Sequence, residues 1–251
     1  MPYKEYVVFE KPDNVQQKIW RFIDGEKFSD LLNRHALYFT RSDLLGDKWE
    51  GKKTNPERIL TQQYRKDWAE RIHLNQQDQE KIMKLNSETD RDLLQHTFVN
   101  CWHMCDQDSK DMWDIFSKDK KDIAIQSTYL KLRESIKDSR DVFIGKVKYR
   151  DMNIDINPLD SFFRRLVRKG KKFEKEKELR AIVTNWVDEK RNVLKKPLDD
   201  GLLVSVDIDL LVERVIVSSS SSSSFIENTR FVTEKYGLLK KVERSIVSRS
   251  S

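Results

Sequence analysis

Short apolar stretches bounded by polar residues recur along the whole chain, and segments with the periodicity of amphipathic helices lie between them. Seven glycines and five prolines leave few sharp boundaries between segments. The pattern predicts an α+β fold, a single domain over residues 1–251 with a mixed or antiparallel sheet surrounded by helices. The expected strands lie at residues 18–23, 36–40, 97–102, 122–127, 142–149, 179–184, 202–206, 214–217 and 242–247.

A helical insertion is expected at about residues 56–96. Leu60, Tyr64, Trp68 and Ile72 recur every four residues, so they form an apolar stripe along one face of a helix. Residues 73–96 are polar with sparse apolar positions, which predicts peripheral helices.

The composition excludes several classes of protein. The chain has 25 aromatic residues (12 Phe, 7 Tyr and 6 Trp), which argues against disorder. No apolar run approaches the roughly 18 residues that a membrane helix needs, and the first residues do not resemble a signal peptide. Two cysteines cannot cross-link a chain of 251 residues, so we expect a reducing, cytoplasmic setting.

Charge and glycine motifs narrow the function only a little. Lys and Arg number 48 against 42 Asp and Glu, a net charge of +6 that permits contact with nucleic acid, but charges of mixed sign mostly make a well-solvated surface. Neither phosphate-binding glycine fingerprint nor a Gly-x-Ser-x-Gly motif occurs, which argues against P-loop, Rossmann and serine-hydrolase sites.

Cys101, His103 and Cys105 would share one face of a strand, which invites a zinc interpretation. Three ligands so close in sequence would strain a tetrahedral site, and no second cysteine pair or paired histidine exists. We therefore expect no metal and a small, buried Cys101.

The densest charged segment spans residues 171–180. If it is extended, Glu174, Glu176 and Glu178 point to one side, and their mutual repulsion raises the pKa of at least one carboxyl unless cations intervene. Such a carboxyl suits a general base or a group that holds ribose hydroxyls. The alternative is a solvated hairpin of alternating charge.

A basic helix is expected over residues 160–172, with phenylalanines interleaved among its cations. Arg164, Arg165, Arg168 and Lys169 could meet the phosphates of nucleic acid or another anionic target. An amphipathic helix with its basic side in water is the equally good alternative.

The motifs at residues 37–51, 101–103, 112–113, 173–182, 206–211 and 236–238 follow one another in the order found in a prokaryotic family, the domain of unknown function 2971. The chain resembles that family over nearly its whole length. It departs at Lys48 and Trp49, where the family has Pro and Phe, and at His103, where it has Ser. A run of serines, residues 218–224, replaces a proline-containing loop of the family, and we assign this run no role.

The order of three shorter elements is similar to that in ADP-ribosyltransferases. Arg21 lies on the first expected strand, Ser127 and Thr128 end a central one, and a late Glu176-Lys177-Glu178 element follows. The resemblance implies an ADP-ribosyltransferase-like fold with NAD as substrate. In it Arg21 holds the pyrophosphate, Ser127 and Thr128 brace the nicotinamide ribose, and Glu178 with Glu176 stabilises the transition state. Tyr38 or Trp49 would stack on the nicotinamide.

The leading hypothesis is thus an NAD-dependent transferase acting on a protein or nucleic acid, in a phage-defence or mobile-element setting. Two alternatives stay open. One is a non-catalytic nucleic-acid-binding protein that uses the basic segment. The other is a metal-dependent nuclease that uses Asp47, Glu50 and the glutamate-rich segment.

Overall fold

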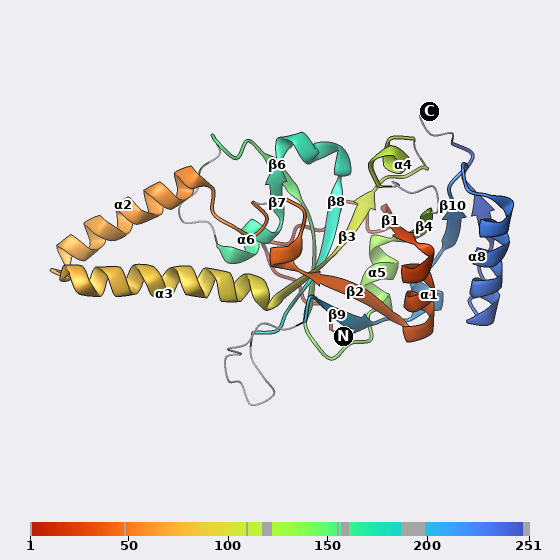
Figure 1. Cartoon of the computed structure of the whole chain (residues 1–251), viewed down its shortest axis with the longest axis horizontal. Helices are drawn as coiled ribbons and strands as arrows, with labels where there is room; N and C mark the ends of the chain where they lie inside the picture. The colour runs from red at the N-terminus through yellow and green to blue at the C-terminus, as the bar shows by residue number, and fades with distance from the viewer. Residues whose placement is uncertain are drawn as a thin grey trace.

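The computed structural model describes residues 2–47, 49–108, 110–116, 122–154, 156, 161–186 and 199–247. In this part the chain forms a mixed nine-stranded sheet, a small two-stranded sheet and surrounding helices, as expected for an α+β fold (Figure 1). The strands are β1 (Lys18–Asp24), β2 (Ala36–Arg41), β3 (Thr97–Met104), β4 (Asp122–Thr128), β5 (Val142–Lys146), β6 (Lys148–Arg150), β7 (Arg168–Gly170), β8 (Glu178–Thr184), β9 (Gly201–Ser205), β10 (Arg214–Val217) and β11 (Val242–Arg244). The helices are α1 (Gly25–Arg34), α2 (Asn55–Arg71), α3 (Gln76–Gln95), α4 (Lys110–Phe116), α5 (Tyr129–Ser135), α6 (Phe162–Leu166), α7 (Ile208–Leu211) and α8 (Ser223–Lys235), with 3-10 turns η1 (Ser42–Leu44) and η2 (Lys171–Glu176).

Strand β3 is the branch point of the large sheet. Along one edge it pairs with β8 over seven residues, from Thr97–Thr184 to His103–Glu178. Its other edge is shared, because β2 pairs near Val99 and β1 pairs near His103. Strands β1 and β2 therefore occupy different stretches of the same edge of β3, and we call the region where they separate the fork.

Polar side chains fill the fork. Arg21 Nη1 donates a hydrogen bond to the carbonyl of Cys101 at 2.9 Å, and Asn100 Nδ2 donates to the carbonyl of Tyr38 at 2.8 Å. These bonds satisfy backbone carbonyls that would otherwise be buried without a partner where the strands separate.

The main hydrophobic core lies between one face of the sheet and helices α1, α5, α7 and α8. Strand β8 shows how the sequence assigns its faces, because Leu179, Ala181 and Val183 belong to this core while Glu178 and Arg180 point to the other face. Two smaller clusters cover that other face, one beneath α4 and one beneath α6 and the N-terminal segment. Each large apolar side chain that is fully buried contributes about 1.5–3 kcal/mol.

Helices α2 and α3 form a hairpin that extends away from the sheet, here called the arm (Figure 1). Thr54 and Glu57 form a capping box at the start of α2, and Asn75 caps α3. Of the expected stripe, Leu60, Tyr64 and Trp68 lie in α2 and Ile72 is its C-cap; all four side chains are exposed. The body of the protein does not cover this stripe.

The basic helix expected over residues 160–172 is wrong beyond Leu166, and residues 157–160 lie outside the described part. After the short helix α6 the chain forms β7, which pairs in parallel with β6, and then the turn η2. Distant carboxylates explain the difference, because Arg165 and Arg168 bind Asp90 and Glu57 of the arm. The tertiary ion pairs override the local helical pattern.

Three smaller expectations are also corrected. The turn η2 covers Lys171–Glu176 and β8 begins only at Glu178, so Glu174, Glu176 and Glu178 do not share one side of an extended strand. The sequence offers Ser224 and Glu227 as a capping box for helix α8, but the helix is capped by Ser222, which accepts a hydrogen bond from Phe225 N. Strand β11 ends at Arg244 because the next residue, Ser245, turns to donate to Asp108 Oδ2.

None of the helices in the described part of the chain is both long and apolar enough to cross a membrane.

Candidate functional site

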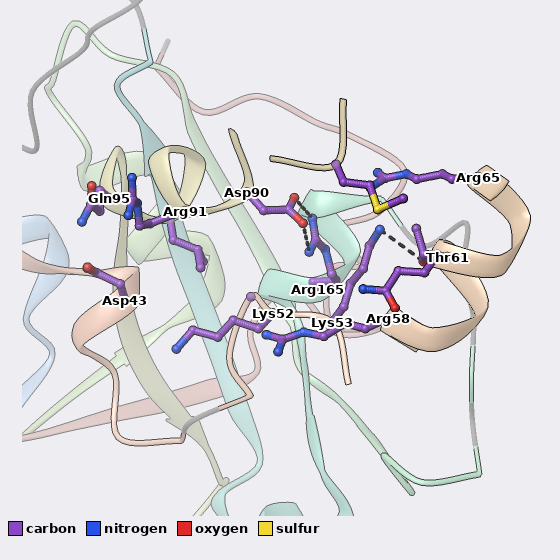
Figure 2. Close-up of a pocket in the computed structure, with 14 residues that line it drawn as sticks. Asp43, Lys52, Lys53, Arg58, Thr61, Arg65, Asp90, Arg91, Gln95 and Arg165 are labelled. Atoms are coloured by element: carbon purple, nitrogen blue, oxygen red, sulfur yellow. Dashed lines mark hydrogen bonds and ion pairs between the residues drawn. The ribbon is translucent and has the colours of Figure 1, made fainter. Parts of the chain in front are cut away.

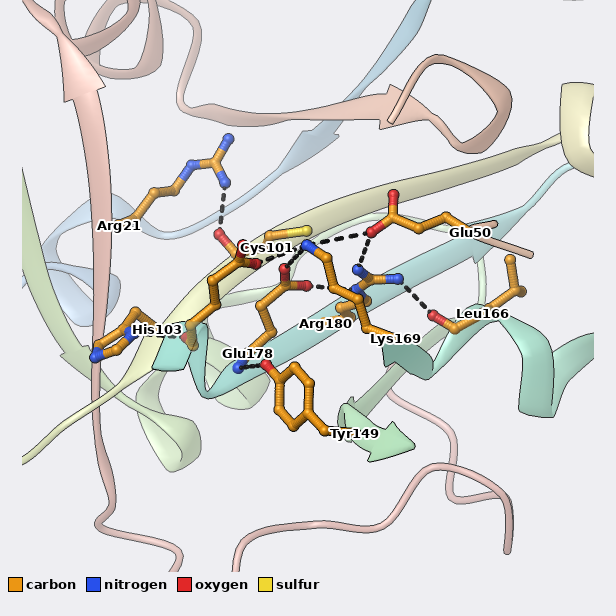
Figure 3. A network of polar contacts seen from close by, with 10 residues as sticks. Arg21, Glu50, Cys101, His103, Tyr149, Leu166, Lys169, Glu178 and Arg180 are labelled. Carbon is orange, nitrogen blue, oxygen red and sulfur yellow. Dashed lines mark hydrogen bonds and ion pairs between the residues drawn. The ribbon is translucent and has the colours of Figure 1, made fainter. Parts of the chain in front are cut away.

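Five charged side chains from distant parts of the sequence meet beside β8, and we call this group the ionic cluster (Figure 3). Lys169 Nζ lies 2.7 Å from Glu178 Oε1, 2.6 Å from Glu176 Oε2 and 3.4 Å from Glu50 Oε1. Arg180 Nε lies 2.6 Å from Glu178 Oε2, and its Nη2 pairs with Glu50. All five side chains are largely or fully buried.

Three carboxylates face two cations in this cluster, so their pKa values separate. Burial opposes the ionisation of Glu178, but Arg180 and Lys169 outweigh it and hold the pKa of that carboxyl well below its usual range. Burial and the neighbouring Glu178 instead raise the pKa of Glu176 to about 7. Glu176 is therefore the member of the cluster that titrates near neutral pH. When Glu176 is protonated, the two remaining carboxylates balance the charges of the two cations.

Two neighbouring side chains form hydrogen bonds with the backbone of Glu176 and Glu178. Tyr149 Oη accepts a hydrogen bond from the backbone N–H of Glu178 at 2.7 Å. His103 Nδ1 lies 2.6 Å from the carbonyl of Glu176, which can only accept, so this nitrogen carries the proton. Burial lowers the pKa of His103, and its Nε2 points away from the cluster (Figure 3). Burial also raises the pKa of Cys101 to about 12, so its thiol is not an activated nucleophile.

The structure brings Glu176 and Glu178 together but separates them from other residues of the transferase hypothesis. Ser127 Oγ donates to the carbonyl of Leu211 at 2.5 Å in the core, and Thr128 caps α5. Arg21 lies in the fork, bonded to carbonyls, and none of the interactions among the described residues joins it to either glutamate.

The two aromatic residues of that hypothesis lie on exposed parts of the chain. Tyr38 is an exposed residue of β2 whose ring lies over Gly201, where a Cβ would come within 1.9 Å of the ring. Trp49 is partly exposed in the loop that precedes the arm.

The structure brings together only some of the residues of the nuclease hypothesis. Glu50 does meet the glutamate-rich segment, but Lys169 and Arg180 already neutralise the carboxylates there. Asp47 lies outside the cluster and accepts from Trp49 N. Within the described residues, no group of three or more His, Cys, Asp or Glu side chains has an arrangement that could hold a metal ion.

A second charged region lies between the arm and the body, and we call it the basic cavity (Figure 2). Its volume is about 650 Å³, within the range of ligand sites. Six cations and two carboxylates line it: Lys52, Lys53, Arg58, Arg65, Arg91, Arg165, Asp43 and Asp90.

Both carboxylates of the cavity are already engaged. Asp90 binds Arg165 through two hydrogen bonds, and Asp43 lies 2.7 Å from Arg41 Nε. Lys53 Nζ lies 3.4 Å from Thr61 Oγ1, and burial together with Arg165 and Arg65 lowers its pKa. Across the described part of the chain, Lys52, Arg58, Arg65 and Arg91 form no ion pair with a carboxylate.

Gly51 joins the two charged regions. Its φ of 67° lets the chain turn between Glu50, which faces the cluster, and Lys52, which faces the cavity. A Cβ at this position would lie 2.4 Å from Leu94 Cδ2, so any other residue would also force the Leu94 side chain to move.

The expected nucleic-acid residues divide among three places. Arg165 lines the basic cavity, while Arg168 and Lys169 are buried in ion pairs with Glu57 and the ionic cluster. Arg164 lies in a separate small hollow beside Lys148 and Arg150.

Sequence reasoning missed most of the cavity's cations. The available signal was the pair Lys52-Lys53 just before α2, followed by Arg58 and Arg65, which are two turns apart on one face of that helix.

Comparisons of the chain with protein-family models, with curated proteins and with solved structures found no match. The resemblance to the domain of unknown function 2971 family stays a prediction. Function must therefore be judged from the geometry and charge of the site.

Proposed function

We propose that this protein binds nucleic acid through the basic cavity. The observation that carries the proposal is the charge balance of the cavity, where six cations face two carboxylates. Asp90 pairs with Arg165 inside the cavity and Asp43 pairs with Arg41 outside it, so most of the cations keep no carboxylate partner among the described residues. Cations without counter-charges in a concave site attract phosphate, because each contact releases a condensed counterion from the nucleic acid.

The spacing of the cations favours a chain of phosphates over a single small anion. Arg58 and Arg65 lie seven residues apart on α2, which is about 10 Å at 1.5 Å per residue. A single phosphate group is too small to contact both guanidiniums at that separation, whereas successive phosphates of one strand can do so. Lys52 before α2 and Arg91 on α3 widen the same surface.

The proposal is tested with a fluorescent oligonucleotide and its anisotropy on titration with protein. We expect the double variant Arg58→Ala, Arg91→Ala to bind at least about tenfold more weakly than the wild type, since two phosphate contacts are removed. The control is Lys171→Ala, Lys172→Ala, which removes two exposed charges from η2, outside the cavity. Equal weakening by both double variants, or by neither, would contradict the proposal.

An NAD-dependent transferase, with the ADP-ribosyltransferase-like architecture it implies, is a second candidate. What favours it is the pair of glutamates whose pKa values separate, since such pairs supply an acid and a base at neutral pH. The partly exposed Glu176 would face the ribose, and Arg21 would hold the pyrophosphate with a guanidinium that the fork does not neutralise.

This candidate predicts release of nicotinamide from NAD. The bond between nicotinamide nitrogen and ribose carbon breaks, and the same carbon forms a new bond to a nucleophilic atom of the target or to water. Glu176→Gln and Glu178→Gln should each abolish release, while Glu174→Gln, an exposed neighbour on the same turn, should not. No release by the wild type, with or without cell lysate, would rule the candidate out.

A further inference from the structure

A small apolar hollow lies between the two helices of the arm. Its volume is about 240 Å³, and five of the seven described residues that line it are apolar: Trp68, Ala69, Leu74, Ile82 and Met83, together with Arg65 and Gln79. Arg65 and Met83 also line the basic cavity. The hollow and the cavity therefore adjoin each other at these two side chains.

Exposed aromatic side chains flank this hollow. On α2, Tyr64 is 62% exposed and Trp68 is 47% exposed. They are four residues apart and so stand on the same side of the helix, about 6 Å from each other along its axis. An apolar surface rimmed by charged residues is typical of an interaction site, because its exposure to water is otherwise unfavourable.

We infer that the ligand of the basic cavity is single-stranded nucleic acid, one base of which enters the apolar hollow and stacks against Trp68. The inference rests on the proposed function and names its ligand more closely. Arg65 stands where the two spaces meet, so a base in the hollow would place its own phosphate beside this guanidinium and the next phosphates toward Arg58.

The charges of the site select this occupant. A base inside a duplex is stacked on both faces, so it can enter the hollow only when it is unpaired. A second copy of this chain would bring the uncompensated cations of one cavity against those of another, which is unfavourable. An apolar peptide would fill the hollow but would leave the adjoining cations without counter-charges.

The experiment compares three probes of equal length: a single strand, the same sequence as a duplex, and an abasic strand that keeps the phosphates. We expect the wild type to bind the single strand most tightly. Trp68→Ala should weaken that binding by roughly tenfold, as loss of one stacked base does, and should leave affinity for the abasic strand unchanged. Trp68→Phe, which keeps an aromatic face, should restore most of the affinity.

Ile59→Ala is the matched control, because Ile59 is also an exposed apolar residue of α2 but lines neither space. Equal loss of affinity by Trp68→Ala for all three probes would overturn the inference, as would no loss for any. Competition by a free mononucleotide as effective as the strand, or dimerisation that Trp68→Ala abolishes, would also overturn it. If the arginine variants weaken binding and Trp68→Ala does not, only the inference fails; if neither weakens it, the proposed function fails as well.

Discussion

The ionic cluster and the basic cavity are two charged regions built from the same segments of chain, and they differ in how their charges are balanced. Residues 50–53 and 165–169 contribute to both. In the cluster, Lys169 and Arg180 lie within ion-pair distance of three carboxylates and are almost wholly buried. In the cavity, Arg58 and Arg91 are exposed, and neither forms an ion pair with a carboxylate of the described residues. Buried, matched charges hold elements together, whereas exposed, unmatched charges are available to a ligand.

The largest effect expected from this comparison is on stability. Arg180→Ala should lower the free energy of unfolding by about 3–5 kcal/mol, because it leaves Glu50 and Glu178 buried with only Lys169. Urea denaturation measures the change, with Lys175→Ala, an exposed cation of η2, as the control. A loss below about 1 kcal/mol, typical of surface pairs, would mean that the cluster does not tie β8 to the loop before the arm.

The cluster should also give the protein a pH dependence that the cavity does not. Glu176 has a pKa near 7 in the folded protein, above the ordinary value of 4.5, so between these pH values the folded state binds the extra proton. Its contribution to stability is therefore present below pH 4.5 and is lost as the pH rises to 7.

Glu176→Gln removes this dependence. The free energy of unfolding of the variant, minus that of the wild type, should rise on the order of 1 kcal/mol between about pH 5 and pH 8, a modest value because the side chain is partly exposed. Urea denaturation at both pH values measures it. A difference that stays constant over this range would show that Glu176 is already ionised at pH 5, as Glu178 is.

The smallest expected effect concerns the stability of cavity variants. Arg58→Ala and Arg91→Ala should each change the free energy of unfolding by less than about 0.5 kcal/mol, because neither side chain has a charged partner to lose. Thermal unfolding of each variant without ligand checks this. A clear destabilisation would show that these cations stabilise the arm. The cavity would then not differ from the ionic cluster in the role of its charges.

Local patterns predicted much of the fold but not its contacts. The alternation in β8, the apolar runs of β3 and β4 and the two arm helices follow from short-range periodicity. The fork of β1 and β2 does not, because the register of β3 with three neighbours depends on residues far apart in the chain.

The candidate site was still less predictable for the same reason. The glutamate-rich segment pointed to Glu176 and Glu178. Glu50, which binds the same cations, lies more than a hundred residues earlier in the sequence. The segment after Leu166 showed a helical pattern, yet Arg168 binds the distant Glu57, so the chain leaves the helix there. Whether a cation has a counter-charge is a property of the tertiary structure, and composition alone does not reveal it.

The salt dependence of oligonucleotide binding tests the central claim most directly. For the wild type, the logarithm of the association constant should fall linearly with the logarithm of salt concentration. Arg58→Ala with Arg91→Ala should make that slope shallower by about 1.4, two contacts at roughly 0.7 each for a single strand. Lys171→Ala with Lys172→Ala should leave it unchanged. A slope that the cavity variant does not alter, or that the control alters as much, would contradict the account.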